Sequence, residues 1–476
     1  MKKILLGFII VFALKGSAQS SFQLYGVSPS GGTNNTGVLY SYDPINNINI
    51  VKHNFDSING AYPNYIIQAT NGNIYGVAGG GGVNKKGVIF EYDPVASIYT
   101  KLHDFDSTNG SGPVGLVQYS GNNKLYGVTF GGGSHNFGII YEFDILNNLF
   151  TKKFDFDSTN TGGSGQAAML NANNGKLYNM LYYGGLYGFG TLFAYDPIAN
   201  VFTKLQDLKW ATGCSPRANN ELIQATDGNI YGMTNAGGIY GYGTIFQYII
   251  STNTYTLKQS FNQNGTNGDN PGGGMVQATN GKLYGTTDEG GTIGDGILFE
   301  YNYVTNSLVT VHNYGFWTST AGINEGSLPT FTPIQGPNNK IYSTTYNGGA
   351  NNLGVLFEFD PIDSTYTKKL DFNGANGVSG YYKLLVLDTV LTNSIKNVSD
   401  KTFFSIYPNP SNGSFVIEAN NTKQTMQVYD VNGKLVLSQN INGKTTIDAS
   451  SLNEGVYTIS IISNEGVVNK KLVIIR

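Results

Sequence analysis

The sequence predicts an all-β protein, a seven-bladed β-propeller followed by a small immunoglobulin-like β-sandwich. Each period of about 50 residues contains short β-type runs, in which side chains alternate between the two faces of a strand. It also contains Asn-Gly or Asp-Gly dipeptides, which favour tight hairpins. After residue 387 this period is lost and a different set of short strands begins. The period is set by a Tyr that precedes a glycine cluster and an aromatic strand, at Tyr25, Tyr75, Tyr126, Tyr178, Tyr231, Tyr284 and Tyr342, with spacings of 50, 51, 52, 53, 53 and 58 residues.

Residues 1–18 have the features of a secretory signal peptide. Lys2 and Lys3 precede the apolar run Ile4–Leu14, and small residues lead to Ala18. Because this run is too short to cross a bilayer, we expect cleavage after Ala18 and export of the remainder. No other stretch reaches spanning length, so we expect no membrane span in the mature chain.

Each repeat offers four strands, named a to d in chain order. In the third copy, strands a, b and c are Val114–Tyr119, Lys124–Thr129 and Gly138–Phe143, and in the second copy strand d is Tyr99–Leu102. Four antiparallel strands per repeat are typical of a propeller blade. The first copy lacks strand a, whereas the seventh continues into Tyr381–Leu387. We therefore predict that Tyr381–Leu387 is the innermost strand of the first blade and closes the ring.

The order of these motifs resembles two repeat families. Tyr75, Gly79–Gly80, Tyr92–Asp93–Pro94 and Tyr99–Thr100–Lys101–Leu102 resemble the kelch propeller. The resemblance to the bacterial glycine-rich repeats named after Gloeobacter and Verrucomicrobia is closer and covers roughly residues 24–387. That family defines a repeat and implies no activity. The motifs that fit it are Gly281–Thr287, Gly290–Gly291, Gly296–Phe299 and the series Phe261, Gly265 and Pro271.

The domain boundaries follow from these observations: a propeller at 19–387, a linker at 388–402 and a C-terminal domain at 403–476. In the last domain, the segments Tyr407–Pro410, Val428–Lys434 and Gly455–Tyr457 resemble the type A sorting domain of the type IX secretion system of Bacteroidetes. This resemblance implies that the type IX machinery is a partner. It also implies a secreted protein or one on the outer cell surface.

Composition excludes several classes of function. Charged residues make up 12% of the chain, and the net charge of −3 becomes −6 once the three lysines of the signal peptide are removed. Such mild acidity gives no surface for nucleic acid. The single cysteine, Cys214, cannot form an internal disulfide, and we interpret it as a small buried thiol. We expect a monomer without a cofactor.

Two recurring motifs suggest metal sites, but we favour structural roles for both. Asp104–Gly110 places oxygens at alternate positions, as calcium loops do, yet its glycine is one place late and no bidentate Glu follows. We interpret it as an Asx turn, with calcium as the alternative. His53, His103 and His312 occupy the same position in three repeats, so we expect solvated strand residues on separate blades and no metal site.

No catalytic residue is predicted. The sequence contains no Ser/His/Asp signature, HExxH motif or Walker loop. Glycoside hydrolysis needs two carboxyl groups that face each other across a sugar. The acids considered for such a pair are Glu221, Asp288, Glu289, Asp295 and Glu325, and their spacing selects no pair among them.

Irregular aromatic residues indicate where a ligand binds. Aromatics present in every repeat are expected to pack between blades, whereas a ligand site is asymmetric. Since b–c and d–a loops emerge on one face, these side chains are predicted to bind carbohydrate or another surface ligand, with ordinary loop packing as the alternative. The predicted residues are Tyr183 and Tyr187 in the fourth repeat, Tyr240 and Tyr242 in the fifth, and Trp317 in the enlarged sixth d–a connection.

The sequence thus predicts an exported binding or structural protein. The alternative is an extracellular propeller enzyme that acts on polysaccharide, and two buried, facing carboxylates at the mouth of the central channel would favour it. A third hypothesis is a purely structural or adhesive component of the cell coat.

Overall fold

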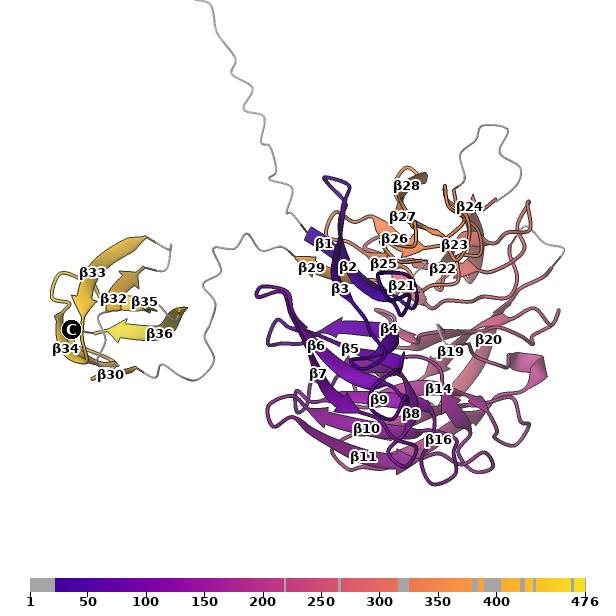
Figure 1. Cartoon of the computed structure of the whole chain (residues 1–476), viewed down its shortest axis with the longest axis horizontal. Coiled ribbons are helices and arrows are strands. Elements are labelled where there is room, and N and C mark those ends of the chain that lie inside the picture. Colours follow the sequence, from indigo (N-terminus) through magenta and orange to yellow (C-terminus); the bar gives the residue numbers. More distant parts are fainter. Residues whose placement is uncertain are drawn as a thin grey trace, which may run out of the picture. The chain divides into compact units, whose positions relative to one another are not determined.

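The computed structural model describes residues 22–217, 220–263, 267–315, 325–378, 384–388, 404–419, 424–430, 434–463 and 466–475. Regular structure within these ranges consists of β-strands and one short 3-10 helix, η1 (Trp210–Thr212) (Figure 1). None of the helical structure described there is long and apolar enough to cross a membrane. The chain divides into two compact units, residues 1–388 and 389–476. The predicted signal peptide and nearly all of the predicted linker lie outside the described residues.

The described part of the first unit forms seven antiparallel sheets, numbered here in chain order. Sheet 1 contains β29 (Leu385–Asp388), β1 (Phe22–Ser28), β2 (Val38–Asp43) and β3 (Ile48–Asn54). Sheet 2 contains β4 (Ala61–Gln68), β5 (Ile74–Gly80), β6 (Val88–Asp93) and β7 (Ile98–Asp104). Sheet 3 contains β8 (Ser111–Gln118), β9 (Leu125–Gly131), β10 (Ile139–Asp144) and β11 (Leu149–Asp155). Sheet 4 contains β12 (Gly163–Gly165), β13 (Leu170–Asn171), β14 (Leu177–Tyr183), β15 (Thr191–Asp196) and β16 (Val201–Asp207).

The remaining sheets follow the same order along the chain. Sheet 5 contains β17 (Ile223–Gln224), β18 (Ile230–Thr234), β19 (Thr244–Ile249) and β20 (Thr254–Ser260). Sheet 6 contains β21 (Met275–Gln277), β22 (Leu283–Thr287), β23 (Ile297–Asn302) and β24 (Ser307–Asn313). Sheet 7 contains β25 (Ile334–Gln335), β26 (Ile341–Thr344), β27 (Val355–Asp360) and β28 (Thr365–Asp371). The two outermost strands of every sheet, such as β6 and β7 or β15 and β16, share a register shift at the same place, as structural repeats require.

The segment that follows the last repeat pairs with the first strand of the chain. In sheet 1, β29 runs antiparallel to β1, with Phe22 opposite Asp388 and Tyr25 opposite Leu385. The predicted pairing with the first strand is therefore confirmed for residues 385–387. Residues 381–383 of the predicted strand lie outside the described residues. The pairing covers an edge of β1 that would otherwise expose unpaired backbone groups.

Seven hydrophobic clusters join each sheet to its neighbour, and one of them joins sheet 7 back to sheet 1. The repeated tyrosines lie in these clusters, and each is almost fully buried. The hydroxyl groups of six of them, all but Tyr25, form side-chain hydrogen bonds. Tyr75, for example, donates to Glu91 at 2.7 Å and accepts from Asn71 at 2.9 Å. The prediction that the regular aromatics pack between repeats is confirmed.

A row of glutamines also bridges neighbouring sheets, and the sequence reasoning missed it. Gln118 Oε1 in sheet 3 accepts a 2.8 Å hydrogen bond from the Thr70 amide in sheet 2. Gln224, Gln277 and Gln335 make the equivalent bond to the preceding sheet. Each glutamine ends the innermost strand of its sheet, so these bonds tie successive innermost hairpins together.

The Asp-rich loops are Asx turns, as expected. Asp106 Oδ1 accepts hydrogen bonds from the Thr108 and Asn109 amides at 2.8 and 2.7 Å, and Asp56 and Asp157 repeat the pattern. Cys214 is fully buried, as predicted, and burial raises the pKa of its thiol.

The prediction of solvated histidines is wrong. His53, His103 and His312 each stack face to face on an aromatic ring of the next sheet, at centroid distances of 3.8, 4.0 and 3.9 Å. Burial lowers the pKa of all three, to about 4 for His312. On the fourth strand, side chains alternate between the two faces of the sheet, and these three histidines lie on the face that packs against the next sheet. The flat imidazole ring fits the space between the two sheets because it can stack on the facing aromatic ring.

The second unit has its own core between two sheets. One sheet contains β30 (Ser405–Tyr407), β31 (Ser414–Glu418) and β34 (Lys444–Asp448). The other contains β33 (Leu435–Ile441), β32 (Gln424–Tyr429), β35 (Gly455–Ser463) and β36 (Gly466–Ile474). Alternating residues such as Phe415, Ile417, Met426 and Val428 fill the space between them, as in a β-sandwich. Residues 431–433 of the segment Val428–Lys434 lie outside the described residues.

Candidate functional site

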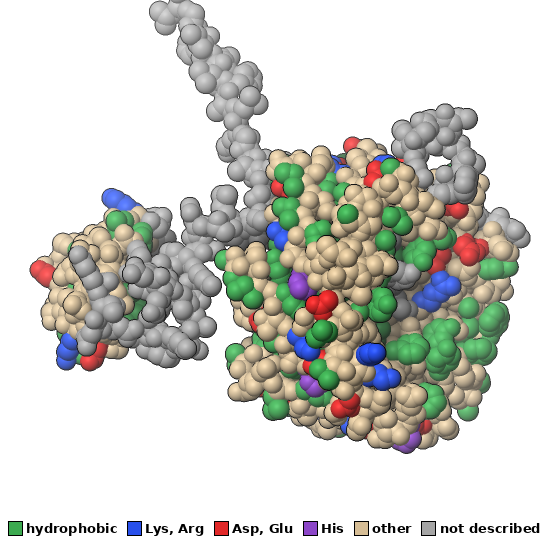
Figure 2. All heavy atoms as spheres, viewed as in Figure 1, with side chains coloured by type: hydrophobic (Ala, Val, Ile, Leu, Met, Phe, Trp, Pro, Cys, Tyr) green, Lys and Arg blue, Asp and Glu red, His purple; other side chains and the backbone are tan. Residues whose placement is uncertain are grey.

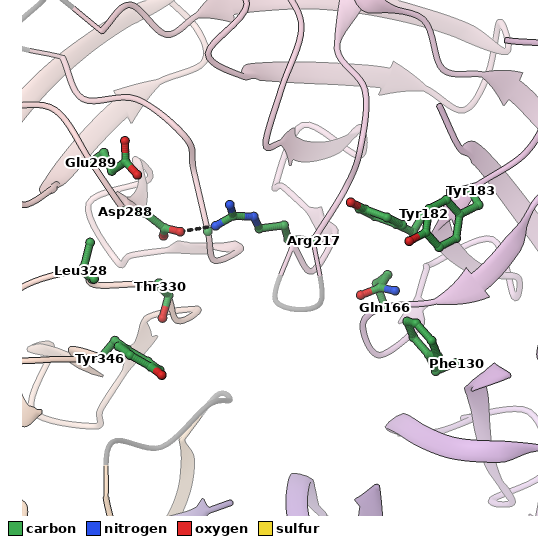
Figure 3. A pocket seen from close by; sticks show the side chains of 11 residues that line it. Phe130, Gln166, Tyr182, Tyr183, Arg217, Asp288, Glu289, Leu328, Thr330 and Tyr346 are labelled. Carbon is green, nitrogen blue, oxygen red and sulfur yellow. Dashed lines mark hydrogen bonds and ion pairs between the residues drawn. The ribbon is translucent and has the colours of Figure 1, made fainter. Parts of the chain in front are cut away.

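A pocket of about 670 Å³ opens where the second strands of several sheets end. It lies on the face of the b–c and d–a loops, which is the face predicted to carry function. Its side chains come from segments more than 200 residues apart in the sequence (Figure 3). The lining residues are Phe130, Gln166, Tyr182, Tyr183, Arg217, Gly272, Asp288, Glu289, Leu328, Thr330 and Tyr346.

Most of the lining comes from two positions of the repeat. The fourth residue after the repeated tyrosine supplies Phe130, Tyr182, Asp288 and Tyr346. The second position follows Pro216, Pro271 or Pro329 a few residues before the innermost strand in three copies, and it supplies Arg217, Gly272 and Thr330. In the fourth copy it supplies Gln166, directly after β12. Because the backbone repeats from sheet to sheet, these positions converge on one mouth. Their side chains differ from copy to copy, so the mouth is asymmetric although the scaffold is regular.

An ion pair joins two sides of this pocket. Arg217 Nη1 donates to Asp288 Oδ2, while the Arg217 side chain stays 48% exposed and that of Asp288 only 7%. Gly272 permits this placement, since a Cβ there would overlap the Asp288 carboxyl group. In Figure 3, Arg217 extends toward Asp288 and Glu289 on one wall, and Tyr182, Tyr183, Gln166 and Phe130 form the opposite wall.

The acids on this wall have unusual protonation. Burial raises the pKa of Asp288 to about 7; Arg217 opposes this shift, and Glu289 and Asp269 add to it. Burial, with a contribution from Glu289, raises the pKa of Asp269 to about 6. Asp269 adjoins the pocket wall, because its amide donates to the Glu289 carbonyl at 2.9 Å. A carboxyl group that titrates near neutrality makes the charge of the pocket depend on pH.

The model of one repeat family matches most of the chain. The Gloeobacter/Verrucomicrobia repeat matches residues 14–220, 159–330 and 218–456. The chain belongs to the Gloeobacter/Verrucomicrobia repeat family. The closer of the two predicted resemblances is thereby confirmed, and the pocket lies where copies of this repeat differ.

Solved structures share the fold of this repeat protein at low sequence identity. One is a putative 6-phosphogluconolactonase from Bacteroides fragilis, with 16% identity and a TM-score of 0.53 over 78% of this chain and 99% of the other. Another is a putative 6-phosphogluconolactonase from Bacteroides uniformis, with 11% identity and a TM-score of 0.51 over 78% of this chain and all of the other. At such identities the likeness shows a propeller-like fold alone. No curated protein matches the sequence.

The structure brings only one of the five predicted site residues into the pocket. Tyr183 lines it, about half exposed, beside Tyr182. Tyr187 is exposed in the β14–β15 loop, and Tyr240 lines a separate depression of about 450 Å³ on the rim. Tyr242 packs against the cluster between sheets 5 and 6, and its hydroxyl donates to Gln263 at 2.5 Å. Trp317 lies outside the described residues.

Figure 2 shows few charged side chains and several apolar patches on the face of the first unit in view. Exposed apolar side chains occur on the loops that carry Tyr187 and Tyr240, namely those of Leu186 and Ile239, and Trp210 is exposed in η1 between β16 and β17. Within the ranges that the structure describes, no group of three or more His, Cys, Asp or Glu side chains is arranged to hold a metal ion. The rim therefore offers apolar and aromatic contacts, and the charged groups gather inside the pocket.

Sequence reasoning considered Asp288 and Glu289, and noted Tyr182 among the irregular aromatics of the fourth repeat, but it missed Arg217 and Tyr346. A usable signal exists, because Arg217 is one of two arginines in the chain and the other is the final residue, Arg476. Aligning the seven copies and asking which positions change type would have selected Phe130, Tyr182, Asp288 and Tyr346 together. Glu221, in contrast, lines another cavity of about 420 Å³ between the innermost strands, near Tyr65.

Proposed function

We propose that the protein is an exported, seven-bladed, kelch-like propeller that binds carbohydrate in the pocket at the mouth of its ring. The observation that carries this proposal is the convergence of aromatic and hydrogen-bonding side chains from several sheets on one cavity. Aromatic faces stack on the apolar faces of sugar rings, and polar groups such as Gln166 and Arg217 suit their hydroxyls. A regular scaffold with an asymmetric mouth is the arrangement expected of a binding module.

The proposal includes the architecture and the route of export. Seven sheets joined by seven hydrophobic clusters support seven blades within residues 19–387. The two-sheet second unit supports an immunoglobulin-like sorting domain at 403–476 that delivers the protein through the type IX secretion machinery. The signal peptide at 1–18, the linker at 388–402 and a monomeric protein, secreted or on the outer cell surface, belong to the same proposal.

Within the binding site, Tyr183 is the predicted residue best placed to contact a ligand. Exposed Tyr187 and Tyr240 would extend the surface along the rim for a longer glycan. Tyr242 would support the fifth loop, since its ring is partly buried and its hydroxyl is engaged. Trp317 stays a proposed contact on sequence grounds alone.

One observation favours the alternative, an enzyme that acts on polysaccharide. Asp288 has a pKa of about 7, which suits a general acid. Its closest acidic companion in the pocket, Glu289, is exposed and follows it directly in the chain. Both carboxyl groups therefore belong to one wall, whereas a glycosidase pair flanks the sugar. For this reason we prefer the binding function.

A glycan array probed with the full mature chain tests the proposal. We expect retained glycans to be lost with Tyr183→Ala and kept with Ile362→Ala, a control in the β27–β28 turn on the opposite face. An array without any bound glycan would contradict carbohydrate binding. Release of reducing ends from a bound polysaccharide, abolished by Asp288→Asn, would favour the enzyme instead.

A further inference from the structure

We propose that the sugar recognised by this pocket carries an oxyanion, either a carboxylate or a sulfate ester, which Arg217 binds and Asp288 helps to position. This inference rests on the proposed carbohydrate function and specifies its ligand class. It starts from the charge carried by the lining residues. Among the lining residues that the structure describes, Arg217 is the one cation, and it extends between the acidic wall and the wall of tyrosines.

The choice of residue supports an anionic partner. The chain contains 28 basic residues, of which only Arg217 and Arg476 are arginines. A guanidinium group presents parallel donors that match carboxylate and sulfate oxygens, whereas lysine acts as a point charge. Of the 28 basic residues, 26 are lysines, so arginine is rare in this chain. One of its two arginines lies in the pocket, where it could bind a planar oxyanion.

Asp288 orients Arg217 and leaves it accessible. Its carboxylate is buried against Gly272, where the absence of a side chain leaves just enough room. Oδ2 accepts from Arg217, and Oδ1 has no hydrogen-bond partner. Since Asp288 is nearly enclosed and Arg217 is 48% exposed, a ligand meets the guanidinium group first. Asp288 is therefore a positioning residue that acts on the ligand through Arg217.

The other charged groups near Arg217 weaken rather than cancel its attraction for an anion. Glu289 is exposed, so water screens its charge, and Asn270 Nδ2 donates to its carboxylate at 3.2 Å. Asp269 is buried and, like Asp288, titrates near neutrality because burial raises its pKa. As the pH falls from 8 to 6, both aspartates take up protons and the charge of Arg217 becomes less compensated. Affinity for an oxyanion should rise over this range.

The opposite wall supplies the contacts for the sugar ring. Tyr182 and Tyr183 lie nearly perpendicular, with ring centroids 4.3 Å apart, and thus present one face and one edge to the pocket. Phe130 adds apolar surface on this wall, and Tyr346 adds apolar surface across the pocket, on the side of Thr330 and Asp288. A sugar that stacks on this wall can direct a carboxylate or sulfate group toward Arg217. These contacts alone would not distinguish a neutral sugar from a charged one.

The test compares matched ligands by calorimetry with the full mature chain at pH 6 and pH 8. One pair is oligogalacturonate and its methyl ester, and the other is dextran sulfate and dextran. We expect at least one anionic ligand to bind about tenfold or more tightly than its neutral partner, as charge-assisted bonds should give. Arg217→Gln should remove that preference, Arg217→Lys should keep part of it, and the exposed control Lys209→Gln should keep all of it.

The variants also separate binding from folding. Arg217→Gln/Asp288→Asn leaves no unpaired charge, so its melting temperature shows whether a loss of binding arises from unfolding. Asp288→Asn should reduce the rise in affinity between pH 8 and pH 6. Equal binding of neutral and anionic partners, or an unchanged preference in Arg217→Gln, would overturn this inference and leave the carbohydrate function intact. Absence of binding to every glycan on the array would overturn both.

Discussion

The three stacked histidines should make the stability of the propeller depend on pH, and His312 offers the clearest test. Burial lowers its pKa from 6.5 to about 4. The Glu325 carboxylate lies 3.6 Å from Nε2, but its side chain is 40% exposed, so water screens its charge. Because the folded-state pKa is depressed, the stabilising effect is complete above pH 6.5 and is lost as the pH falls toward 4. The unfolded and folded pKa values differ by roughly 2.5 units, and each unit corresponds to about 1.4 kcal/mol. Protonation of His312 should therefore lower the free energy of unfolding by about 3 kcal/mol.

His312→Phe should remove this dependence without removing the stack. Phe154 occupies the same repeat position in sheet 3 and stacks on Phe202 of sheet 4 at 4.5 Å. Urea unfolding at pH 4.5 to 7.5 would measure the free energy of unfolding of both proteins. The difference between variant and parent should grow in favour of the variant as the pH falls below 6.5. His135→Phe, in an exposed loop, should follow the parent. Parallel curves for His312→Phe and the parent would refute the reasoning.

Two further predictions concern the packing within a sheet and the closure of the ring. Gly76→Ala should cost ~3 kcal/mol, because its Cβ would lie 2.7 Å from the Tyr65 carbonyl oxygen and overlap a neighbouring ring. Gly281 has open space around it but a φ of +81°, so Gly281→Ala should lower the free energy of unfolding by only about 1 kcal/mol. Equal losses of unfolding free energy for the two variants in chemical denaturation would contradict the close packing of Gly76. Gln23→Cys/Leu387→Cys should form an internal disulfide, because their Cα atoms are register partners in sheet 1. A double variant that stays reduced under oxidising conditions would argue against the closure.

The fold was predictable because the repeat multiplies a weak signal. One run such as Leu125–Gly131 does not define a strand with certainty, but seven similar runs at one spacing define both the strand and its place in a sheet. The closure by β29 was predictable for a related reason: the first copy lacks one strand and the last copy has one to spare. Both inferences compare copies of the repeat and do not depend on local propensity.

Contacts between sheets were harder to predict. His103 is visible in the sequence as a repeated position, but its stacking partner, Phe150, belongs to the next copy. Gln118 likewise bonds to Thr70 of the preceding copy. Sequence periodicity reports the register within a repeat, whereas these partners depend on the angle and distance between sheets. For this reason buried histidines were interpreted as solvated.

The pocket opens on the face that the loop composition selected, but most of its lining residues were not selected. Reasoning from loop composition chose Tyr183, which lines the pocket, and Tyr187 and Tyr240, which are exposed outside it. The ion pair of Arg217 and Asp288 joins residues 71 positions apart in two different copies. Comparison of the copies can select the positions that vary in residue type, but the pairing of Arg217 with Asp288 depends on strand ends and on the turns into the innermost strands, which the backbone determines.

The pairing of β29 with β1 has a consequence for how freely the order of the repeats can be rearranged. Phe22 and Asp388 are antiparallel neighbours, so a short linker could join the present ends of the ring as a hairpin. New ends could then be placed in any exposed connection between sheets, and the same seven sheets would follow one another from a different starting point. The ring of sheets therefore does not require the chain to begin at the present first repeat. Circularly permuted versions should retain both the packing between sheets and the asymmetric mouth.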